Sequence, residues 1–401
     1  MPAAQSIRIC AVRQFPFDTH LKREVDALLD AGHEVDVVCM SRPGEARRER
    51  RGALTIWRMP IGHRRAGALR YVIEHAAFVA TAALTVAALH LRRRFEVVQV
   101  NSPPDSVVLA ALVPKLAGTP VLLDLVECTP EFFSTRFGAG LDHPLVRILM
   151  AVEQGAIRFA DHAITGTRQM RERFVGRGAD GGRIDVVLNA SDERYFAAAP
   201  DVATPAGTDG AFTLICHGSI ERRYGLDTVI RAVALLADEL PQLRFEIYGE
   251  GSDWPELERL AAELGVSRRV RCHGFVPIDE LVSAIARADA GVVAVKRDPF
   301  RDLTHTNKMF DYVAMRRPAI VSWTQSVADY FDATALEFFR SDDAEDLARA
   351  IRDVHRDPKR RRAMVVRAAE LYEEYRWPRQ RTIYLDAVQR LAALSRVSAA
   401  T

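Results

Sequence analysis

The segment from Phe212 to Ser322 constrains the fold of this chain most strongly. It opens with an apolar run, FTLICHG, that passes through a polar, basic turn into an amphipathic helix. It closes with a helix holding NKMFDYVAM and a further apolar run, RPAIVS. Short apolar runs that alternate with amphipathic helices are typical of a parallel sheet, because parallel strands need long crossover connections. The sequence therefore predicts a Rossmann-like α/β domain in this half of the chain.

Basic residues lie after the predicted strands, at the edge where such sheets bind their ligands. Arg222 and Arg223 follow the first run, and Lys308 follows a later one. Backbone N–H groups at Gly218 and Ser219 stand beside them, and a helix N-terminus adds positive potential. A solvated turn is the alternative explanation for the two arginines, but arginine suits bidentate contact with phosphate. The pattern indicates a polyanionic ligand, and a diphosphate fits that description.

The first half of the chain repeats the same alternation of strands and helices. A chain of 401 residues exceeds a single hydrophobic core. We therefore expect a second Rossmann-like domain here. Its predicted strands are Ile7–Val12, Val35–Met40, Leu54–Met59, Val97–Val100, Val121–Leu125, Asp161–Thr165 and Ile184–Leu188.

Composition places the boundary between the two domains. The segment Tyr195–Gly210, YFAAAPDVATPAGTDG, has the small, Pro- and Gly-rich composition of a linker. We expect domains at residues 1–195 and 211–378, facing each other across a cleft. A helical pattern at Asp346–Tyr375 follows no obvious strand. The last helix, at about residues 380–401, is a candidate to pack back on the first domain.

Charge and cysteine content limit the partners and the compartment. The chain has 55 Lys and Arg against 53 Asp and Glu, so it lacks the strong basic excess of a nucleic-acid-binding protein. Its five cysteines have neither zinc nor redox spacing, and a reduced, cytoplasmic setting is the simplest interpretation. The N-terminus is short of the apolar residues that a secretory signal needs.

Two N-terminal segments indicate contact with a membrane surface. Tyr71–Leu91 matches the length of a membrane span and is flanked by arginines, but Glu74 and His75 inside it favour a buried or membrane-grazing helix. The polar loop at Arg42–Gly52 is rich in arginine, which anionic lipid attracts. We therefore expect a cytoplasmic protein that can bind the inner face of the membrane without an anchor.

Several short motifs follow one another in order along nearly the whole chain. The first half contains GHEV, PPD before a helix, DLVECTPE, FADHAITGTRQMRERFVGRG and VVLNASDERYF. The second half continues with HGSIERRYGLD, IYGEGSDWPELERLA, VRCHGFVPIDEL, RADAGVVAV and NKMFDYVAMRRPAI. This order resembles that of family-4 retaining glycosyltransferases. The resemblance implies a glycosyltransferase B-type fold, a nucleotide-sugar donor held mainly by the C-terminal domain, and an acceptor held mainly by the N-terminal one. It also implies that no metal and no other cofactor is needed.

The same resemblance assigns donor-binding roles to residues of the second half. The basic stretch after the HG turn, with Arg222 as the closest match, and Lys308 would contact the diphosphate. Asp311 stands where the family has a Glu that accepts hydrogen bonds from the donor ribose. The other donor-binding candidates are Gly218, Ser219, Arg223, Gly249, Asn307, and the backbone of Phe275 and Val276, which would face the base.

Some positions depart from the family pattern. QFPFDTH stands where members usually have a Gly-Gly turn close to the donor phosphate. Val126 stands where many have a His, and Leu303 stands where the first of two glutamates is found. Arg316 replaces a turn Gly.

Carboxylates that follow a predicted strand end are the candidates for a catalytic role. We expect Asp124, Glu127 and Glu131 to lie near one another, where mutual repulsion would raise one pKa towards the range useful for acid–base catalysis. Helix capping and solvation of the loop explain them equally well. Asp18 and His20, in the first strand–helix loop, can stand in for missing groups, although capping is the favoured role of Asp18.

These observations predict a retaining glycosyltransferase that moves a hexosyl or related sugar from a nucleoside-diphosphate sugar to a glycan or lipid-linked acceptor. Cell-envelope or exopolysaccharide synthesis is the expected setting, and an anionic membrane surface is an expected partner, whereas nucleic acid is not. Two alternatives stay open. The carboxylates would suit a nucleotide-sugar epimerase of the same architecture, and Val126 and Leu303 would suit a catalytically silent nucleotide-sugar-binding protein.

Overall fold

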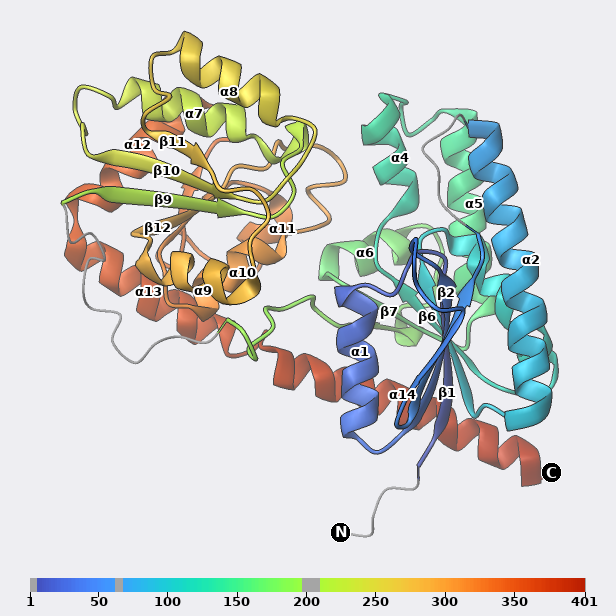
Figure 1. Ribbon diagram of the computed structural model, residues 1–401. Helices are drawn as coiled ribbons and strands as arrows, with labels where there is room; N and C mark the ends of the chain where they lie inside the picture. The colour runs from blue at the N-terminus through green and yellow to red at the C-terminus, as the bar shows by residue number, and fades with distance from the viewer. Residues whose placement is uncertain (1–5, 62–67, 197–209, 401) are drawn as a thin grey trace. The chain divides into compact units, whose positions relative to one another are not determined.

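The computed structural model describes residues 6–61, 68–196 and 210–400. Two compact units divide the chain: Met1–Leu188 with Gln380–Thr401, and Asn189–Arg379. Each is an α/β unit built on a mainly parallel sheet (Figure 1). The predicted fold class, with two Rossmann-like domains, is confirmed. Of the predicted linker, residues 197–209 lie outside the described residues.

The sheet of the first unit has the strand order β3-β4-β2-β1-β5-β6-β7-β8. All neighbouring strands are parallel except β3, which is antiparallel to β4. Most residues of the central strands are apolar, chiefly valine, leucine and isoleucine, and their side chains are buried on both faces, as is typical of parallel sheets. The strands are β1 (Arg8–Arg13), β2 (Glu34–Met40), β3 (Arg48–Arg51), β4 (Leu54–Met59), β5 (Val97–Ser102), β6 (Val121–Leu125), β7 (His162–Thr165) and β8 (Ile184–Val186).

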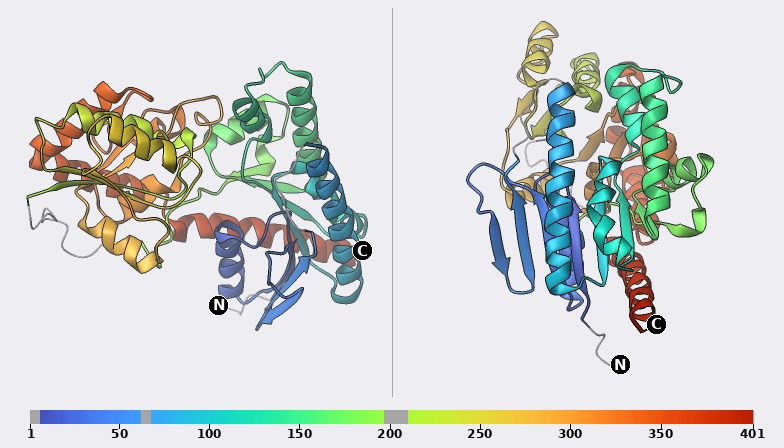
Figure 2. Two further views of the ribbon diagram at one scale, coloured as in Figure 1. Left: turned by 45° about the horizontal axis from the view of Figure 1, so that its top comes forward. Right: turned by 90° about the vertical axis from the view of Figure 1, so that its right-hand side faces the viewer.

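Helices cover both faces of this sheet. The helix α1 and the C-terminal helix α14 lie on one face, and α2, the 3-10 helix η1 and α5 lie on the other (Figures 1 and 2). Tyr384 of α14 donates its hydroxyl proton to Gln99 of β5 at 2.6 Å, which ties the end of the chain to the centre of the sheet. The helices are α1 (Thr19–Asp30), α2 (Ala68–Arg93), η1 (Asp105–Ala111), α3 (Leu112–Leu116), α4 (Thr129–Phe137), α5 (Pro144–Phe159), α6 (Arg168–Gly176), η2 (Gly181–Arg183) and α14 (Trp377–Ala400).

Part of the segment predicted as a polar loop, Arg42–Gly52, is the edge strand β3. Its main chain pairs with β4, with Glu49 opposite Ile56. Four charged residues in a row show no alternation of apolar and polar side chains, so the sequence does not indicate a strand. Charged side chains suit this position, because they discourage pairing of an exposed edge with other chains.

The second unit has a wholly parallel sheet in the order β11-β10-β9-β12-β13-β14. His217 pairs with Tyr248, and Ile247 pairs with Cys272, so β9, β10 and β11 end side by side. The strands are β9 (Phe212–His217), β10 (Leu243–Tyr248), β11 (Val270–Cys272), β12 (Ala290–Val293), β13 (Ala319–Ser322) and β14 (Glu337–Phe339).

In this unit α7, α8 and α12 lie on one face of the sheet, and α9, α10 and α13 lie on the other (Figure 1). The helical pattern at Asp346–Tyr375 is not one helix but two. It breaks at Asp357, whose side chain caps the next helix, because Pro358 cannot donate the hydrogen bond that a continuous helix needs. The helices are the 3-10 turn η3 (Arg222–Tyr224), α7 (Leu226–Leu235), α8 (Trp254–Glu263), α9 (Ile278–Arg287), α10 (Asn307–Ala314), α11 (Gln325–Ala328), α12 (Ala344–Arg356) and α13 (Pro358–Tyr372).

Candidate functional site

Three turns meet where β9, β10 and β11 end. The N–H of Gly218 donates to the carbonyl oxygen of Tyr248, and the N–H of Gly249 donates to that of Gly274, each at 2.8 Å. Gly249 has a φ of +146°, and a Cβ placed there would lie 1.9 Å from the carbonyl oxygen of Gly218. Only glycine allows this approach. Two of the predicted donor-binding glycines therefore shape one edge of the sheet together.

Some of the backbone donors predicted in the first turn are used within the unit. The N–H of Gly218 bonds to Tyr248, and that of Ile220 bonds to the carbonyl oxygen of Glu250 at 2.9 Å. No described residue accepts a hydrogen bond from the N–H of Ser219. Ser219 is exposed, so its N–H is the donor in this turn that a ligand can use.

Lys308 lies in the first turn of the helix α10, and its side chain extends to the turn that contains Gly218. Its Cε lies 3.0 Å from a Cβ placed on Gly218. Its Nζ lies 4.1 Å from the centre of the Tyr224 ring. The side chain is 9% exposed, yet no described residue forms a hydrogen bond or ion pair with Nζ. Burying an unpaired ammonium group is costly, so the position favours a bound anion.

The N-terminus of α10 adds to this positive region. The side chain of Thr306, the residue before the helix, makes no capping hydrogen bond within the described part of the chain, and the first turn contains no acidic residue. The Oγ1 atom of Thr306, which precedes the helix, is buried and has no partner among the described residues. Asn307 is partly buried. Unsatisfied N–H groups at a helix N-terminus are a recurrent binding site for phosphate.

Two arginines lie close to the ring of Tyr224, in addition to Lys308. The Cζ atoms of Arg223 and Arg301 each lie 5.3 Å from the ring centre. Arg222 and Arg223 are exposed, whereas Arg301 is 6% exposed. Sequence reasoning missed Tyr224 and Arg301. Arg301 stands in a charged loop where its burial has no sequence signature, but the Tyr next to the predicted arginine pair was a usable signal.

Asp311, one turn along α10 from Lys308, already has partners within the unit. Its Oδ1 accepts a hydrogen bond from the Ser191 hydroxyl at 2.5 Å, and its Oδ2 lies 3.5 Å from Nε2 of His217. Burial and the positive charge of Lys308 lower the pKa of His217 to about 3. The imidazole is therefore neutral, and its contact with Asp311 is not an ion pair.

The predicted base-binding loop follows β11. Phe275 is 81% exposed, which is unusual for so large an apolar side chain, and Val276 is partly buried. His273, at the base of the loop, stacks on Tyr248 with ring centres 4.3 Å apart. The loop is joined to the turn of β10 through the hydrogen bond between Gly249 and Gly274. An exposed aromatic ring beside a fixed loop is suited to stacking on a planar ligand.

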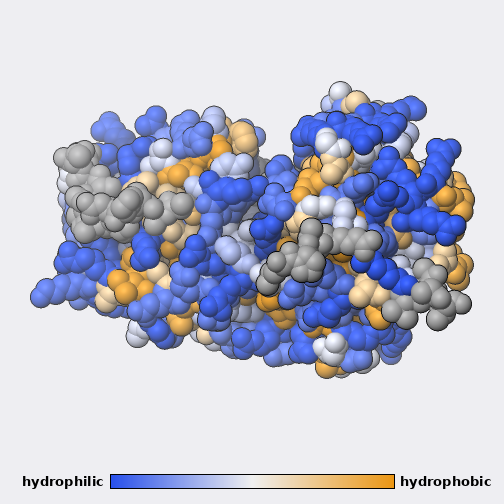
Figure 3. All heavy atoms as spheres, turned by 90° about the horizontal axis from the view of Figure 1, so that it is seen from below, coloured by the Kyte–Doolittle hydropathy of each residue, from blue (hydrophilic) through white to orange (hydrophobic). Residues whose placement is uncertain are grey.

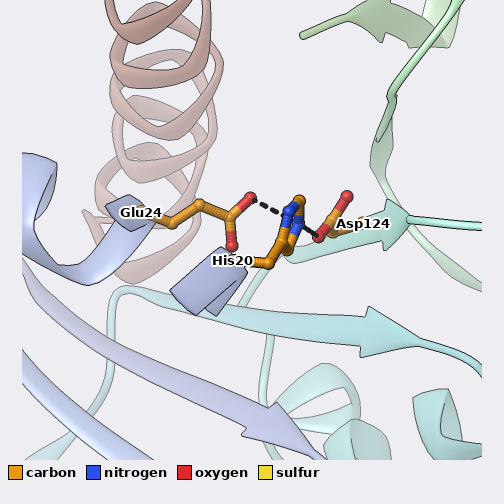
Figure 4. Close-up of side chains that lie close together, drawn as sticks. All are labelled: His20, Glu24 and Asp124. Atoms are coloured by element: carbon orange, nitrogen blue, oxygen red, sulfur yellow. Dashed lines mark hydrogen bonds and ion pairs between the residues drawn. The ribbon is translucent and has the colours of Figure 1, made fainter. Parts of the chain in front are cut away.

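In the first unit, His20 of α1 and Asp124 of β6 form the centre of a polar cluster (Figure 4). Nε2 of His20 lies 2.8 Å from Oδ2 of Asp124 and 3.6 Å from Oε1 of Glu24. The amide of Asn101 donates to both carboxylates, at 2.6 Å to Asp124 and 2.9 Å to Glu24. The amide of Gln99 donates to Glu24 at 2.8 Å. Four elements, α1, β5, β6 and α14, thus meet in one buried network.

Two members of the cluster, Glu24 and His20, have a raised pKa. Burial and the nearby charge of Asp124 raise the pKa of Glu24 to about 7. Burial lowers the pKa of His20, but the attraction of Asp124 and Glu24 outweighs it, and the pKa is raised overall. The cluster can therefore hold a proton near neutral pH or pass it to a bound hydroxyl group. The donor atoms of His20, Glu24 and Asp124 lie within 4.8 Å of one another, close enough to hold a cation as well.

Two of the three predicted catalytic carboxylates, Asp124 and Glu131, have different partners in the structure. Glu131 is fully buried and pairs with Arg177 at 2.6 Å, and Arg177 also pairs with Glu153 at 3.0 Å. Among the described residues, Glu131 and Asp124 have no partner in common. Glu127, which lies between these two residues in the sequence, is partly buried. Spacing alone could not separate these positions, because a turn and the start of α4 lie between them.

An exposed apolar surface covers the α2 face of the first unit. The right-hand view of Figure 2 shows the blue helix α2 and the teal helices of residues 105–159 on one side of the sheet, and Figure 3 shows apolar residues along the outer edge of this unit. Among the described residues, Val72–Arg93 is the one segment long and apolar enough to cross a membrane. The exposed residues are Val72, Ile73, Leu84, Leu91, Leu109, Leu112, Val113, Leu116, Leu145, Ile148 and Val152.

Both units match known protein families. Residues 18–190 match the family described as "Glycosyl transferase 4-like domain", and residues 211–357 match the one described as "Glycosyl transferases group 1". Over 279 residues the chain is 28% identical to 2-deoxystreptamine glucosyltransferase of Streptomyces kanamyceticus. The match covers 66% of this chain and 70% of the glucosyltransferase.

Solved structures show the same fold at lower sequence identity. Sucrose-phosphate synthase from Thermosynechococcus elongatus superposes with a TM-score of 0.76 at 17% identity, over 96% of this chain and 99% of that one. HepE of Anabaena, in complex with UDP, superposes with a TM-score of 0.71 at 14% identity, over 96% of this chain and 100% of that one.

Proposed function

The chain belongs to the glycosyltransferases with the GT-B fold, and from that premise we propose that it moves a hexosyl or related sugar from a nucleoside-diphosphate sugar to a glycan or lipid-linked acceptor, with retention of configuration. The second unit binds the donor, and the first unit binds the acceptor. The resemblance of the motif order to retaining enzymes supports the stereochemistry. HepE was solved with UDP, which makes uridine nucleotides the first donors to test.

The observation that carries this proposal is the set of cations around Tyr224. Lys308 and Arg301 are both buried, and neither forms an ion pair with a described carboxylate. A nucleoside-diphosphate sugar supplies negative charge to such cations, and Lys308, which lies against the turn of Gly218, contacts the diphosphate through charge-assisted hydrogen bonds. As the bond between sugar and phosphate breaks, negative charge grows on the departing nucleotide. Fixed cations that are already in place stabilise that charge without reorganising.

We propose that no metal ion and no other cofactor takes part. Lys308 and the uncapped N-terminus of α10 supply the positive charge that a bound metal supplies at other phosphate sites. Activity is then unchanged by EDTA. A loss of activity in EDTA that Mg²⁺ or Mn²⁺ restores would refute this part of the proposal.

We propose further that the first unit works at the inner face of the membrane, as a peripheral cytoplasmic protein in envelope or exopolysaccharide synthesis. The apolar surface over α2, α3 and α5 supports this, as do the exposed Arg92 and Arg94 at the end of α2. Burial of apolar surface contributes about 25 cal/mol per Å². Each arginine near anionic lipid contributes about 1 kcal/mol. Such a surface brings the enzyme to a lipid-linked acceptor.

Two measurements test the activity. A thermal-shift panel of UDP, GDP, ADP and their sugars identifies the donor, because a ligand that binds only the folded state raises the unfolding temperature. The identified donor is then incubated with the enzyme, with and without candidate acceptors, and the released nucleoside diphosphate is measured. We expect release that depends on the acceptor. Conversion of the donor to an epimer without acceptor, or binding without any turnover, would overturn the proposal.

A further inference from the structure

We propose that Arg301 binds an acidic group on the sugar of the donor. The donor is then a nucleoside-diphosphate sugar acid and not a nucleoside-diphosphate neutral sugar. This inference rests on the proposed function and names the class of its donor. A glycosyltransferase that binds a neutral sugar needs groups that hydrogen-bond hydroxyls. Arg301 offers something different, a permanent positive charge with a planar set of donors.

The position of Arg301 is unusual for an arginine without a ligand. The residue lies in the loop between β12 and α10 and is 6% exposed. Its Cζ lies 5.3 Å from the ring centre of Tyr224 and 5.4 Å from that of Phe300. Its Nε is buried without a partner, and no described residue forms a hydrogen bond or ion pair with the guanidinium group. A buried charge of this kind is retained where an anion binds.

The carboxylates of the same loop do not neutralise Arg301. Asp298 accepts hydrogen bonds from the backbone N–H groups of Phe300 and Arg301, each at 2.8 Å, and so holds the turn. Asp302 accepts from Nε of Arg297 at 2.9 Å. Within the loop the exposed Arg297 is therefore paired with a carboxylate, whereas the buried Arg301 is left for an anionic ligand.

The diphosphate has a separate set of contacts. Lys308 lies against the turn of Gly218, and the free N–H of Ser219 is in that turn. Arg301 instead contacts the rings of Tyr224 and Phe300. Lys308 and Arg301 both lie close to the Tyr224 ring and repel each other when no ligand is bound. The repulsion is relieved when the diphosphate binds beside Lys308 and a second anionic group binds beside Arg301.

A carboxylate matches Arg301 better than hydroxyl groups do. Guanidinium and carboxylate form two parallel hydrogen bonds in one plane. Two residues further on, Leu303 is buried and apolar, so the loop does not place a carboxylate there to accept hydrogen bonds from sugar hydroxyls. The second anion is therefore a carboxylate of the sugar.

Calorimetry on the full chain tests this with UDP, UDP-glucose and UDP-glucuronate, and with GDP, GDP-mannose and GDP-mannuronate. We expect the acidic sugar to bind about 10- to 100-fold more tightly than the neutral sugar on the same base. Arg301→Gln removes this preference and leaves the affinity for the free nucleoside diphosphate unchanged. Arg301→Lys keeps the charge and retains part of the preference.

Arg297→Gln is the matched control, because it removes an arginine of the same loop that is exposed and already paired; it leaves the preference intact. Equal affinity of the wild-type protein for acidic and neutral sugars would overturn the proposal. An equal loss of affinity for nucleotide and nucleotide sugar in Arg301→Gln would also overturn it, since Arg301 would then bind the diphosphate. Absence of binding by every nucleotide is a different failure, because it would refute the proposed function itself.

Discussion

Nε2 of His20 lies 2.8 Å from Oδ2 of Asp124, although 104 positions separate the two residues in the sequence. The contact joins the start of α1 to the end of β6, and Glu24, one turn along α1, completes it. Strand ends and helix starts of a parallel sheet meet on the edge where ligands bind. His20 and Asp124 therefore lie at the edge of the sheet where a ligand of the first unit is expected to bind.

This cluster makes the stability of the first unit depend on pH. Burial raises the pKa of Glu24 from 4.5 to about 7, so the folded state keeps a proton that the unfolded state has lost. The pKa of His20 is raised as well. A state that binds more protons loses stability as pH rises. The contribution of Glu24 falls between about pH 4.5 and 7, and that of His20 falls above about pH 6.5.

We expect Glu24→Gln to flatten this dependence, because the amide does not titrate. The measurement is the unfolding temperature of wild type and variant between pH 4.5 and 8. Glu172→Gln is the control, since Glu172 is an exposed residue of α6 in the same unit, and this variant keeps the wild-type dependence. Parallel curves for wild type and Glu24→Gln across the whole range would contradict the assignment.

Glu131 is expected to matter for stability and not for the reaction. It is fully buried against Arg177. Glu131→Gln leaves that arginine with one fewer charged partner, at a cost of about 1–3 kcal/mol in the free energy of unfolding. Urea unfolding measures this cost. Turnover per folded molecule stays at the wild-type level at low urea, and a large fall in kcat with unchanged stability would return Glu131 to the catalytic group.

Variants of Asp311 test whether this carboxylate contacts the ribose of the donor or only residues of its own unit. If Asp311 accepts hydrogen bonds from the ribose, Asp311→Asn weakens nucleoside-diphosphate binding and spares inorganic pyrophosphate, which has no ribose. Asp311→Glu, which keeps the charge and lengthens the side chain by one methylene group, keeps the affinity. Ser191→Ala is the control, because it removes the internal partner of Asp311 alone. Equal losses for both ligands in Asp311→Asn would show that the carboxylate only holds the site together.

Membrane binding is tested on the apolar surface of α2 and α3. Leu84→Glu combined with Leu116→Glu places charges on two strongly exposed apolar positions and is expected to reduce sedimentation with liposomes rich in anionic lipid. Leu235→Glu, an exposed leucine of α7 in the other unit, leaves it unchanged. Binding of the wild-type protein also falls as salt screens the arginines. Wild-type protein that does not sediment with liposomes would remove the membrane from the account.

Much of the fold could be predicted from the sequence, because parallel strands are buried on both faces and appear as apolar runs. The strands β4 and β6 have the predicted bounds. The strand β3 could not be predicted, since its four charged residues owe their conformation to pairing with β4. The break at Asp357 was predictable in principle, because Pro358 follows it.

The candidate site could be predicted only in part. The turn of Gly218 and the helix with Lys308 were found because a phosphate site uses local chemistry, glycine turns and helix ends. The burial of Arg301 and its contact with Tyr224 depend on how a distant loop packs. The pairing of His20 with Asp124 and of Glu131 with Arg177 likewise arises from tertiary structure. Spacing along the chain carries no information about such pairs.

The most direct test of the central claim is the affinity of Lys308→Ala for UDP and GDP by calorimetry. We expect a loss of about 10- to 100-fold for the nucleotide that the wild-type protein binds, the usual effect of one charge-assisted hydrogen bond. Lys296→Ala is the matched control, because Lys296 is already paired with Asp227 and Asp342, and its affinity stays at the wild-type value. Unchanged affinity of Lys308→Ala for both nucleotides would contradict the donor site described here.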